Sequence, residues 1–153
     1  MTITDVKPAH LDEIQAIECA CFSLPWHRAA LEKQMCAENC VFLAALSDSG
    51  TVMGYIGLMF VLDEGYISNI AVAPEYRRHG VADALISALV ERTKSTLAFM
   101  TLEVRESNHA ARYLYTKHGF ETVGKRKNYY DRPKEDALLL TLFLKKEDTT
   151  TCS

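Results

Sequence analysis

Apolar positions in the first half of the chain switch between helical and strand spacing. After an apolar run at residues 3–6, apolar residues recur every third or fourth position, which predicts a helix that begins near Pro8 and a second helix over 27–38. Apolar and β-branched runs then predict strands at 41–46, at 51–62 and from 67, joined by turns at 47–50 and 63–65. We therefore expect a strand, two helices and then an antiparallel meander.

The second half predicts a strand–helix–strand unit followed by a hairpin. Helical spacing begins after Gly80, a strand pattern covers 99–104, and Asn108 and Gly119 are suited to begin and end a further helix. Strands joined through a helix usually run parallel, so the strands at 67 and 99 should form a central βαβ unit. The last strands are expected at 120–124 and 137–144, on either side of a polar loop that contains 128–130.

These elements predict an α+β domain with a mixed, mostly antiparallel sheet of six or seven strands and about four helices. The length of 153 residues fits one domain, which we place at residues 1–146, with a disordered tail at 147–153. The net charge of -3 argues against direct nucleic-acid binding, which usually needs a basic surface.

The N-terminus lacks the apolar core of a signal peptide, and the apolar stretch at 53–62 is half the ~20 residues of a membrane span. We expect a cytoplasmic monomer that makes no membrane contact.

Cysteine and histidine spacing gives little support for a metal site. The five cysteines are an odd number, which is typical of free thiols in a reducing compartment. Cys19, Cys21, Cys36 and Cys40 could form a zinc set, but they lack the usual C-x-x-C spacing, and we prefer to interpret them as small core residues. The five histidines show no ligand spacing, and we predict no metal.

The stretch from 67 to 89 has the pattern of an anion-binding loop. A β-branched strand breaks at Pro74, passes through Arg77, Arg78 and Gly80, and continues into a helix. A helix N-terminus offers free backbone N–H groups and a positive dipole end, which suit a pyrophosphate. Taken alone, the pattern Arg77-x-x-Gly80-x-Ala82 fits a turn glycine between two exposed arginines equally well.

Further motifs follow in a fixed order along the chain. They are Leu62-Asp63-Glu64, Asn69-Ile70-Ala71-Val72, the 77–82 loop, Leu102-Glu103-Val104-Arg105-Glu106-Ser107-Asn108, Leu114-Tyr115, Gly119-Phe120 and Asn128-Tyr129-Tyr130. With them the chain resembles the GCN5-related N-acetyltransferases (GNAT) and, within these, the RimI family of ribosomal-protein alanine N-acetyltransferases. The resemblance covers nearly the whole chain and implies the GNAT acyl-CoA N-acyltransferase fold.

The resemblance also implies acetyl-CoA as the acetyl donor. Backbone groups of Asn69, Ile70 and Ala71 would hold the pantetheine arm and the thioester carbonyl, and Asn108 would contact the donor. The loop that would hold the pyrophosphate consists of Arg77, Arg78, His79, Gly80, Val81 and Ala82. Ala82 departs from the family pattern, since many relatives have glycine at this position.

Two residues match the family's catalytic pair, Glu103 as general base and Tyr115 as general acid. Strand alternation puts Glu103 on the opposite face from Leu102, where a carboxylate could face a cleft. Tyr115 follows Asn108 by two helical turns, so both lie on one side of a helix. Without the family motifs, a solvated strand carboxylate and a packed core tyrosine explain the same residues.

The pKa of the acceptor favours a peptide α-amine. An α-amine titrates near ~7.7–8.0 and a lysine near ~10.4, so one carboxylate is enough to deprotonate the first at neutral pH. Asp63, Glu64 and the pair Tyr129-Tyr130 could contact a peptide N-terminus, although turn chemistry and hairpin packing explain them equally well.

In the resembled family the acceptor is the N-terminal alanine of a small-subunit ribosomal protein. We expect direct transfer in a ternary complex, because no cysteine lies between Glu103 and Tyr115. The alternatives are a GNAT enzyme that acetylates a lysine side chain or a small-molecule amine, and a non-catalytic acyl-CoA-binding module.

Overall fold

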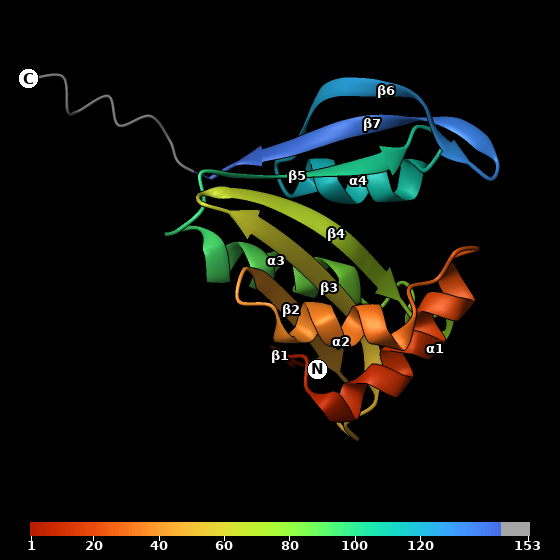
Figure 1. Ribbon diagram of the computed structural model, residues 1–153, viewed down its shortest axis with the longest axis vertical. Helices are drawn as coiled ribbons and strands as arrows, with labels where there is room; N and C mark the ends of the chain where they lie inside the picture. Colours follow the sequence, from red (N-terminus) through yellow and green to blue (C-terminus); the bar gives the residue numbers. More distant parts are fainter. Residues whose placement is uncertain (145–153) are drawn as a thin grey trace, which may run out of the picture.

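The computed structural model describes residues 1–144 (Figure 1). The tail predicted at 147–153 and the last residues of the domain predicted at 1–146 lie outside the described residues.

The helices and strands follow the predicted order. The α-helices of residues 1–144 are α1 (Leu11–Cys21), α2 (Arg28–Cys36), α3 (Val81–Thr93) and α4 (His109–Lys117), and short 3-10 helices cover Pro8–His10 and Pro74–Tyr76. The strands are β1 (Thr2–Asp5), β2 (Cys40–Leu46), β3 (Val52–Val61), β4 (Glu64–Val72), β5 (Phe99–Arg105), β6 (Glu121–Asp131) and β7 (Lys134–Phe143).

All seven strands form one sheet in the order β1-β2-β3-β4-β5-β7-β6. β4 and β5, which α3 connects, run parallel, and the other neighbouring pairs are antiparallel. The predicted α+β fold, with its mostly antiparallel sheet and its central βαβ unit, is therefore confirmed.

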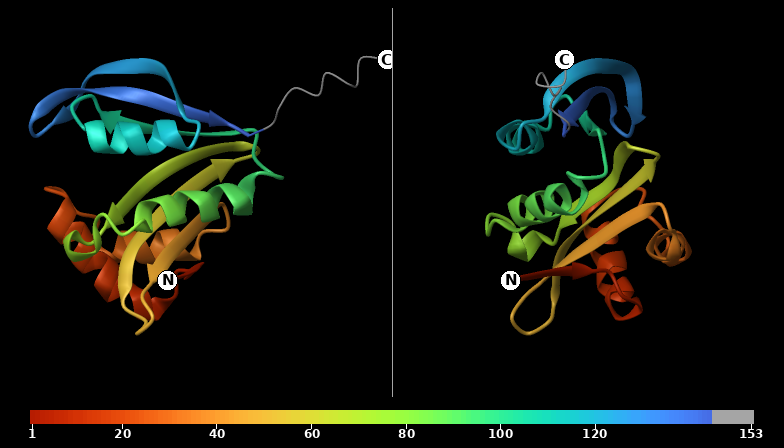
Figure 2. Two further views of the ribbon diagram at one scale, coloured as in Figure 1. Left: turned by 180° about the vertical axis from the view of Figure 1, so that it is seen from behind. Right: turned by 90° about the vertical axis from the view of Figure 1, so that its left-hand side faces the viewer.

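Helices cover both faces of the sheet, as the right view of Figure 2 shows. On one face, α3 and α4 pack on β2 to β5 and β7 around a core that includes Leu85, Leu89 and Leu102. On the other face, α1 and α2 pack on β2 to β4 around a second core that includes Ile14 and Leu31. The helices thereby leave part of β5 and the β6–β7 hairpin uncovered on the α1–α2 side.

The parallel pair is short, and this shapes the centre of the molecule. β5 pairs with β4 only from Glu64↔Phe99 to Tyr66↔Thr101. Beyond these pairs the two strands diverge (Figure 1). On the other side of β4, the register against β3 shifts between Gly57 and Leu58, and Ser68 is the extra residue of this bulge. One edge of β4 is therefore free of a strand partner within the described residues.

Two local predictions were wrong. Tyr129 and Tyr130 do not lie in a loop, because β6 continues to Asp131 and pairs with β7 again after an irregularity at which Asn128 adopts a φ of 56°. β6 is exposed along most of its length, so its sequence lacks the apolar alternation of a half-buried strand. The turn predicted at 63–65 is shorter, and Glu64 already pairs with Val61.

Candidate active site

The candidate site lies where β4 and β5 separate. Asn69, Ile70 and Ala71 pair with β3 on one side, and on the other side no strand of residues 1–144 pairs with them. Backbone N–H and C=O groups along this free edge need partners, so they are available to a ligand. The three residues predicted to hold the thioester thus share one open strand edge.

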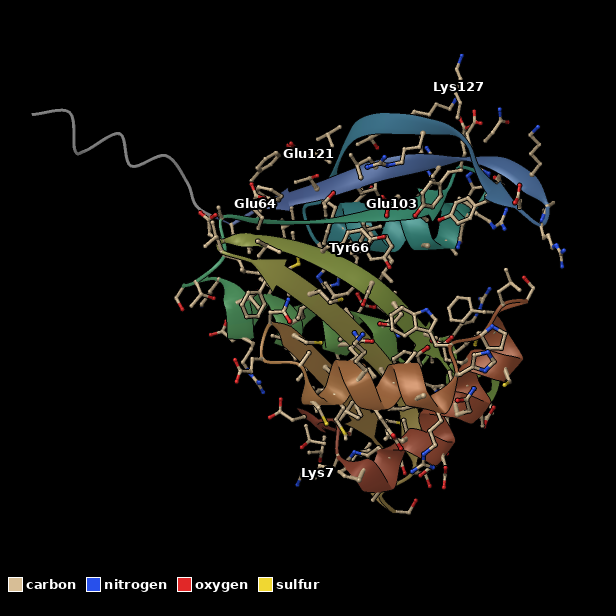
Figure 3. All side chains as sticks on the ribbon, viewed as in Figure 1. Lys7, Glu64, Tyr66, Glu103, Glu121 and Lys127 are labelled. Carbon is tan, nitrogen blue, oxygen red and sulfur yellow. The ribbon has the colours of Figure 1, made fainter. Side chains whose placement is uncertain are left out.

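Glu103 lies on β5 next to this opening, and a tyrosine of β4 holds it. Its side chain is 8% exposed. The Tyr66 hydroxyl donates a 2.6 Å hydrogen bond to Glu103 Oε2, and Arg126 Nε lies 3.3 Å from Oε1. Figure 3 shows Tyr66 and Glu103 together on the side of the sheet that carries α2. The carboxylate is therefore oriented by a neutral donor and faces one exposed cation.

The sequence analysis missed Tyr66. Burial, and then the hydrogen bond to Glu103, raise the pKa of the Tyr66 phenol well above its usual range. The phenol therefore stays protonated and remains a donor at physiological pH. Strand alternation could have placed Tyr66 on the face opposite the buried Ile67. Only the parallel register, Tyr66↔Thr101, brings it to Glu103.

Two tyrosines of β6 stand near this pair. Tyr129 and Tyr130 make an edge-to-face contact with ring centroids 5.0 Å apart, and the Arg105 guanidinium lies 4.2 Å from the Tyr130 ring centroid. Tyr129 also contributes to the raised pKa of Tyr66. Burial raises the pKa of Tyr130 to about 12, with Tyr129 as the next cause. The region beside Glu103 is thus lined by protonated phenols and an arginine.

Tyr115 approaches β5 from the opposite face. It is 4% exposed, belongs to the core under α3 and α4, and packs edge-to-face on Phe120 at 5.4 Å. Burial, with a smaller contribution from Tyr130, raises the pKa of the Tyr115 phenol. Because Leu102 and Val104 point into the same core, Glu103 points to the other side of β5. The two predicted catalytic residues therefore flank one strand from two faces.

The predicted pyrophosphate loop reaches the N-terminus of α3 through two residues with left-handed backbone. Arg78 (φ 64°) and Gly80 (φ 76°) both adopt left-handed conformations, and Gly80 is the N-cap of α3. The first N–H groups of this helix have no partner within it. Val81 is buried, so its side chain belongs to the core, and it can serve a ligand only through its backbone.

Two other side chains predicted to contact acetyl-CoA already have partners inside the protein. Asn108 caps α4, because its Oδ1 accepts a 3.1 Å hydrogen bond from Ala111 N. The guanidinium of Arg77 lies 3.4 Å from Cys21 Sγ. For Asn108, the side-chain Nδ2 is the atom left to donate to a ligand.

The interpretation of the cysteines as core residues was wrong for Cys19 and Cys36. Both side chains are exposed, so they are not core residues. Cys21 and Cys40 are half-buried and pack against the core between α1, α2 and the sheet, so the interpretation holds in part for these two. Within residues 1–144 no group of three or more histidine, cysteine or acidic side chains is arranged to hold a metal ion. No helix in this part of the chain is long and apolar enough to cross a membrane.

Comparisons with known proteins agree on one kind of enzyme. Residues 11–120 match the model of the acetyltransferase (GNAT) family. The ribosomal protein bS18-alanine N-acetyltransferase of Escherichia coli (strain K12) is 33% identical over 144 residues, which cover 92% of this chain and 96% of the relative.

Solved structures agree with this similarity. The crystal structure of the ribosomal-protein-S18-alanine N-acetyltransferase from Escherichia coli has a TM-score of 0.87 at 30% identity, covering 96% of this chain and 97% of that one. Arabidopsis thaliana NAA60 in complex with acetyl-CoA has a TM-score of 0.84, covering 94% and 98% of the two chains. At 19% identity, the latter likeness concerns the fold alone.

Proposed function

The chain belongs to the acetyltransferase (GNAT) family and is an acetyl-CoA-dependent N-acetyltransferase similar to the RimI enzymes, and on this basis we propose that it acetylates the N-terminal alanine of a small-subunit ribosomal protein. The observation that carries the proposal is the carboxylate of Glu103, held by Tyr66 beside the open edge of β4. We further propose that the enzyme acts as a cytoplasmic monomer.

Glu103 serves as the general base. An α-amine is partly neutral at pH 7 to 8, so a carboxylate at this position needs to accept one proton, directly or through a water molecule, as the nitrogen attacks the thioester. The Tyr66 hydroxyl fixes Oε2, which leaves Oε1 toward the exposed side chain of Arg126. The basic oxygen can therefore face an incoming amine without a change in the orientation of the carboxylate.

The open edge of β4 supplies the electrophilic side of the site. A backbone N–H of Ile70 or Ala71 would donate to the carbonyl oxygen, on which negative charge develops during the attack. The N-terminus of α3 and residues 77–82 would hold the pyrophosphate of the donor. These features fit acetyl-CoA because they combine free strand-edge groups with a helix N-terminus that has two left-handed residues before it.

Tyr115 serves as the general acid for the departing thiolate. Its raised pKa keeps the phenol protonated at neutral pH, as a proton donor requires. Transfer is direct: the nitrogen–carbon bond forms, the carbon–sulfur bond breaks, Glu103 takes the amine proton and Tyr115 gives a proton to sulfur. Tyr66, Tyr129 and Tyr130 would border the acceptor side of the site.

The proposal is tested by thiol release from acetyl-CoA with two peptides. One begins with a free alanine followed by basic residues, and the other is blocked at its N-terminus and contains an internal lysine. We expect release with the first peptide alone, and mass spectrometry should place the acetyl group on its α-nitrogen. Release with the blocked peptide alone would overturn Nα-acetylation in favour of a lysine acetyltransferase. Binding of acetyl-CoA without turnover of either peptide would exclude both peptide activities.

A further inference from the structure

A carboxylate is buried between the two halves of the site without a cationic partner. Glu18 of α1 is 1% exposed, and no lysine, arginine or histidine of residues 1–144 forms an ion pair with it. Its oxygens instead accept hydrogen bonds from the Tyr55 hydroxyl, from Trp26 N at 3.1 Å and from Asn69 Nδ2 at 3.5 Å. Donors from three segments therefore converge on the oxygens of one side chain.

These donors come from the elements that border the candidate site. Asn69 lies on the free edge of β4, next to the bulge residue Ser68. Trp26 lies in the connection between α1 and α2, and its carbonyl also accepts a 2.7 Å hydrogen bond from Gln15 of α1. The α1–α2 connection and the β6–β7 turn lie at the same end of the molecule (Figures 1 and 2). The Glu18 side chain thus links β4, which is proposed to bind the acetyl donor, to the α1–α2 connection at the end of the molecule where the acetyl acceptor would bind.

The network continues from Asn69 into α2. Gln34 Nε2 donates to Ser68 Oγ at 3.0 Å and to Asn69 Oδ1 at 3.4 Å, and Ser68 Oγ donates to Asn69 Oδ1 at 3.0 Å. Gly57 makes room for it, because a Cβ there would lie 2.1 Å from Gln34 Nε2 and 2.4 Å from Asn69 Oδ1. The bulge of β4 is therefore fixed by side chains of α1 and α2 as well as by strand pairing.

Stability does not explain this arrangement. Burying a polar group costs desolvation energy that its hydrogen bonds only offset, and even buried ion pairs can often be replaced by well-packed apolar side chains without loss of stability. The network instead specifies a position, since each donor fits only one arrangement of β4, α1 and the α1–α2 connection. Asn69 lies on the open edge of β4 that is proposed to hold the acetyl donor. Trp26 lies in the connection at the end of the molecule that carries the β6–β7 turn, near the tyrosines proposed to border the acceptor (Figures 1 and 2).

We infer that Glu18 is a positioning residue which couples acceptor binding to acetyl-CoA binding, by holding the Ser68–Asn69 bulge and the α1–α2 connection in one arrangement. The inference rests on the proposed function, because it assigns the two sides of that site. When one substrate orders its segment, the network orders the other segment, so each ligand should tighten the binding of the other by the same factor.

The test compares the affinity for CoA, measured by isothermal titration calorimetry, with and without a saturating amount of the alanine peptide. For the unmodified protein we expect a gain of at least ~5-fold, the lower end of typical coupling between sites. Glu18→Gln should reduce the gain to under ~2-fold. It should also lower kcat by a larger factor than it changes the KM of either substrate. Its amide nitrogen is a donor, so at least one of the three hydrogen bonds must be lost.

Controls separate positioning from folding. Ile14→Val, on the same helix and fully buried, removes one methyl group from the core and should keep the coupling. Tyr55→Phe removes one donor and leaves the carboxylate, so it should give an intermediate coupling and serves as the second test if Glu18→Gln fails to fold. Thermal unfolding of all variants checks that losses of coupling do not simply follow losses of stability.

The failures of the two proposals are distinguishable. If the unmodified protein acetylates the alanine peptide but shows no coupling, or if Glu18→Gln and Tyr55→Phe keep it, the positioning role of Glu18 is overturned and the proposed function stands. If only the blocked lysine peptide reacts, the same titration with that peptide decides the coupling, and the proposed α-amine acceptor is overturned. If neither peptide reacts, both proposals fail.

Discussion

The Tyr66 hydroxyl of β4 donates a 2.6 Å hydrogen bond to Oε2 of Glu103 on β5, within three residues of the point where these parallel strands separate. The bond therefore links β4 to β5 at the end of the opening where the two strands are still paired. It fixes one oxygen of a carboxylate that is 8% exposed. The proposed base is therefore oriented before any substrate binds, which is the condition under which a general base works efficiently.

Glu103→Gln should reduce kcat by ~10²-fold or more, because the amide cannot accept the amine proton. The Kd of acetyl-CoA should change little, since the proposed donor contacts lie on β4 and on the 77–82 loop. Steady-state kinetics and calorimetric titration measure the two quantities. Near-normal turnover would remove Glu103 from the role of base.

Tyr66→Phe should reduce kcat by ~10-fold or more and leave KM nearly unchanged, because a hydrogen bond to a charged group contributes ~1.5–3 kcal/mol and ~1.4 kcal/mol corresponds to a tenfold change in rate. Arg126→Gln is the matched control. Arg126 contacts the other oxygen, but its side chain is 55% exposed, so the ion pair should contribute little. Equal losses in the two variants would argue against a specific role for the Tyr66 hydroxyl.

The order of the elements could be predicted because most of them bury one face. The α3 pattern, with Leu85 and Leu89 inside, and the N-cap of α4 at Asn108 are both local features of the sequence. The sequence predicts only the beginning of β6, at 120–124, because this strand exposes both faces along most of its length and therefore has no apolar period. Its existence depends on pairing with β7, a tertiary contact.

The predicted site residues belong to motifs, whereas the residues that support them do not. The contact from Tyr66 to Glu103 depends on a parallel register across 37 residues of sequence, which no local pattern contains. Glu18 carried a usable signal, because it lies four residues after Ile14, on the apolar side of α1. A charged residue at such a position predicts a buried polar contact, but not its partners.

Tyr115→Phe should slow release of the CoA thiol, with a loss of ~10²-fold in kcat and little change in substrate affinity. Because its pKa is raised above the usual value of ~10, kcat of the unmodified enzyme should show no loss from this group between pH 8 and 10. Tyr113→Phe, on the same helix but 72% exposed, is the control and should keep full activity. A Tyr115→Phe enzyme with normal kcat would contradict the assignment of the acid.

Stability should fall above pH 10. The pKa values of Tyr66 and Tyr115 are raised in the folded state, and that of Tyr130 is raised to about 12. The unfolded chain loses its phenol protons near pH ~10, while the folded chain keeps them. The unfolded state then binds fewer protons, so the free energy of unfolding decreases as pH rises from about 10 through the folded pKa values.

Urea unfolding at pH 8, 9.5, 10.5 and 11 measures this loss. One buried phenol contributes at most ~1.4 kcal/mol per pH unit. Tyr115→Phe should therefore reduce the slope above pH 10 by up to this amount, whereas Tyr113→Phe should leave the slope unchanged. A stability that stays constant from pH 8 to pH 11 would contradict the raised pKa values.

Gly80→Val should raise the KM of acetyl-CoA by ~10-fold or more without a comparable loss of kcat at saturation. Gly80 has a φ of 76°, which costs a β-branched residue of the order of 1–3 kcal/mol, and an added Cβ would meet no atom of the protein within 4 Å. The substitution therefore acts through the backbone of the loop rather than through a clash with the core. Gly50→Val is the matched control, since Gly50 has a φ of 85° and equally open surroundings but lies in the turn between β2 and β3. Both variants should lose similar stability, and only the first should bind acetyl-CoA more weakly. An unchanged KM in Gly80→Val, with the expected loss of stability in both, would show that the N-terminus of α3 does not hold the pyrophosphate.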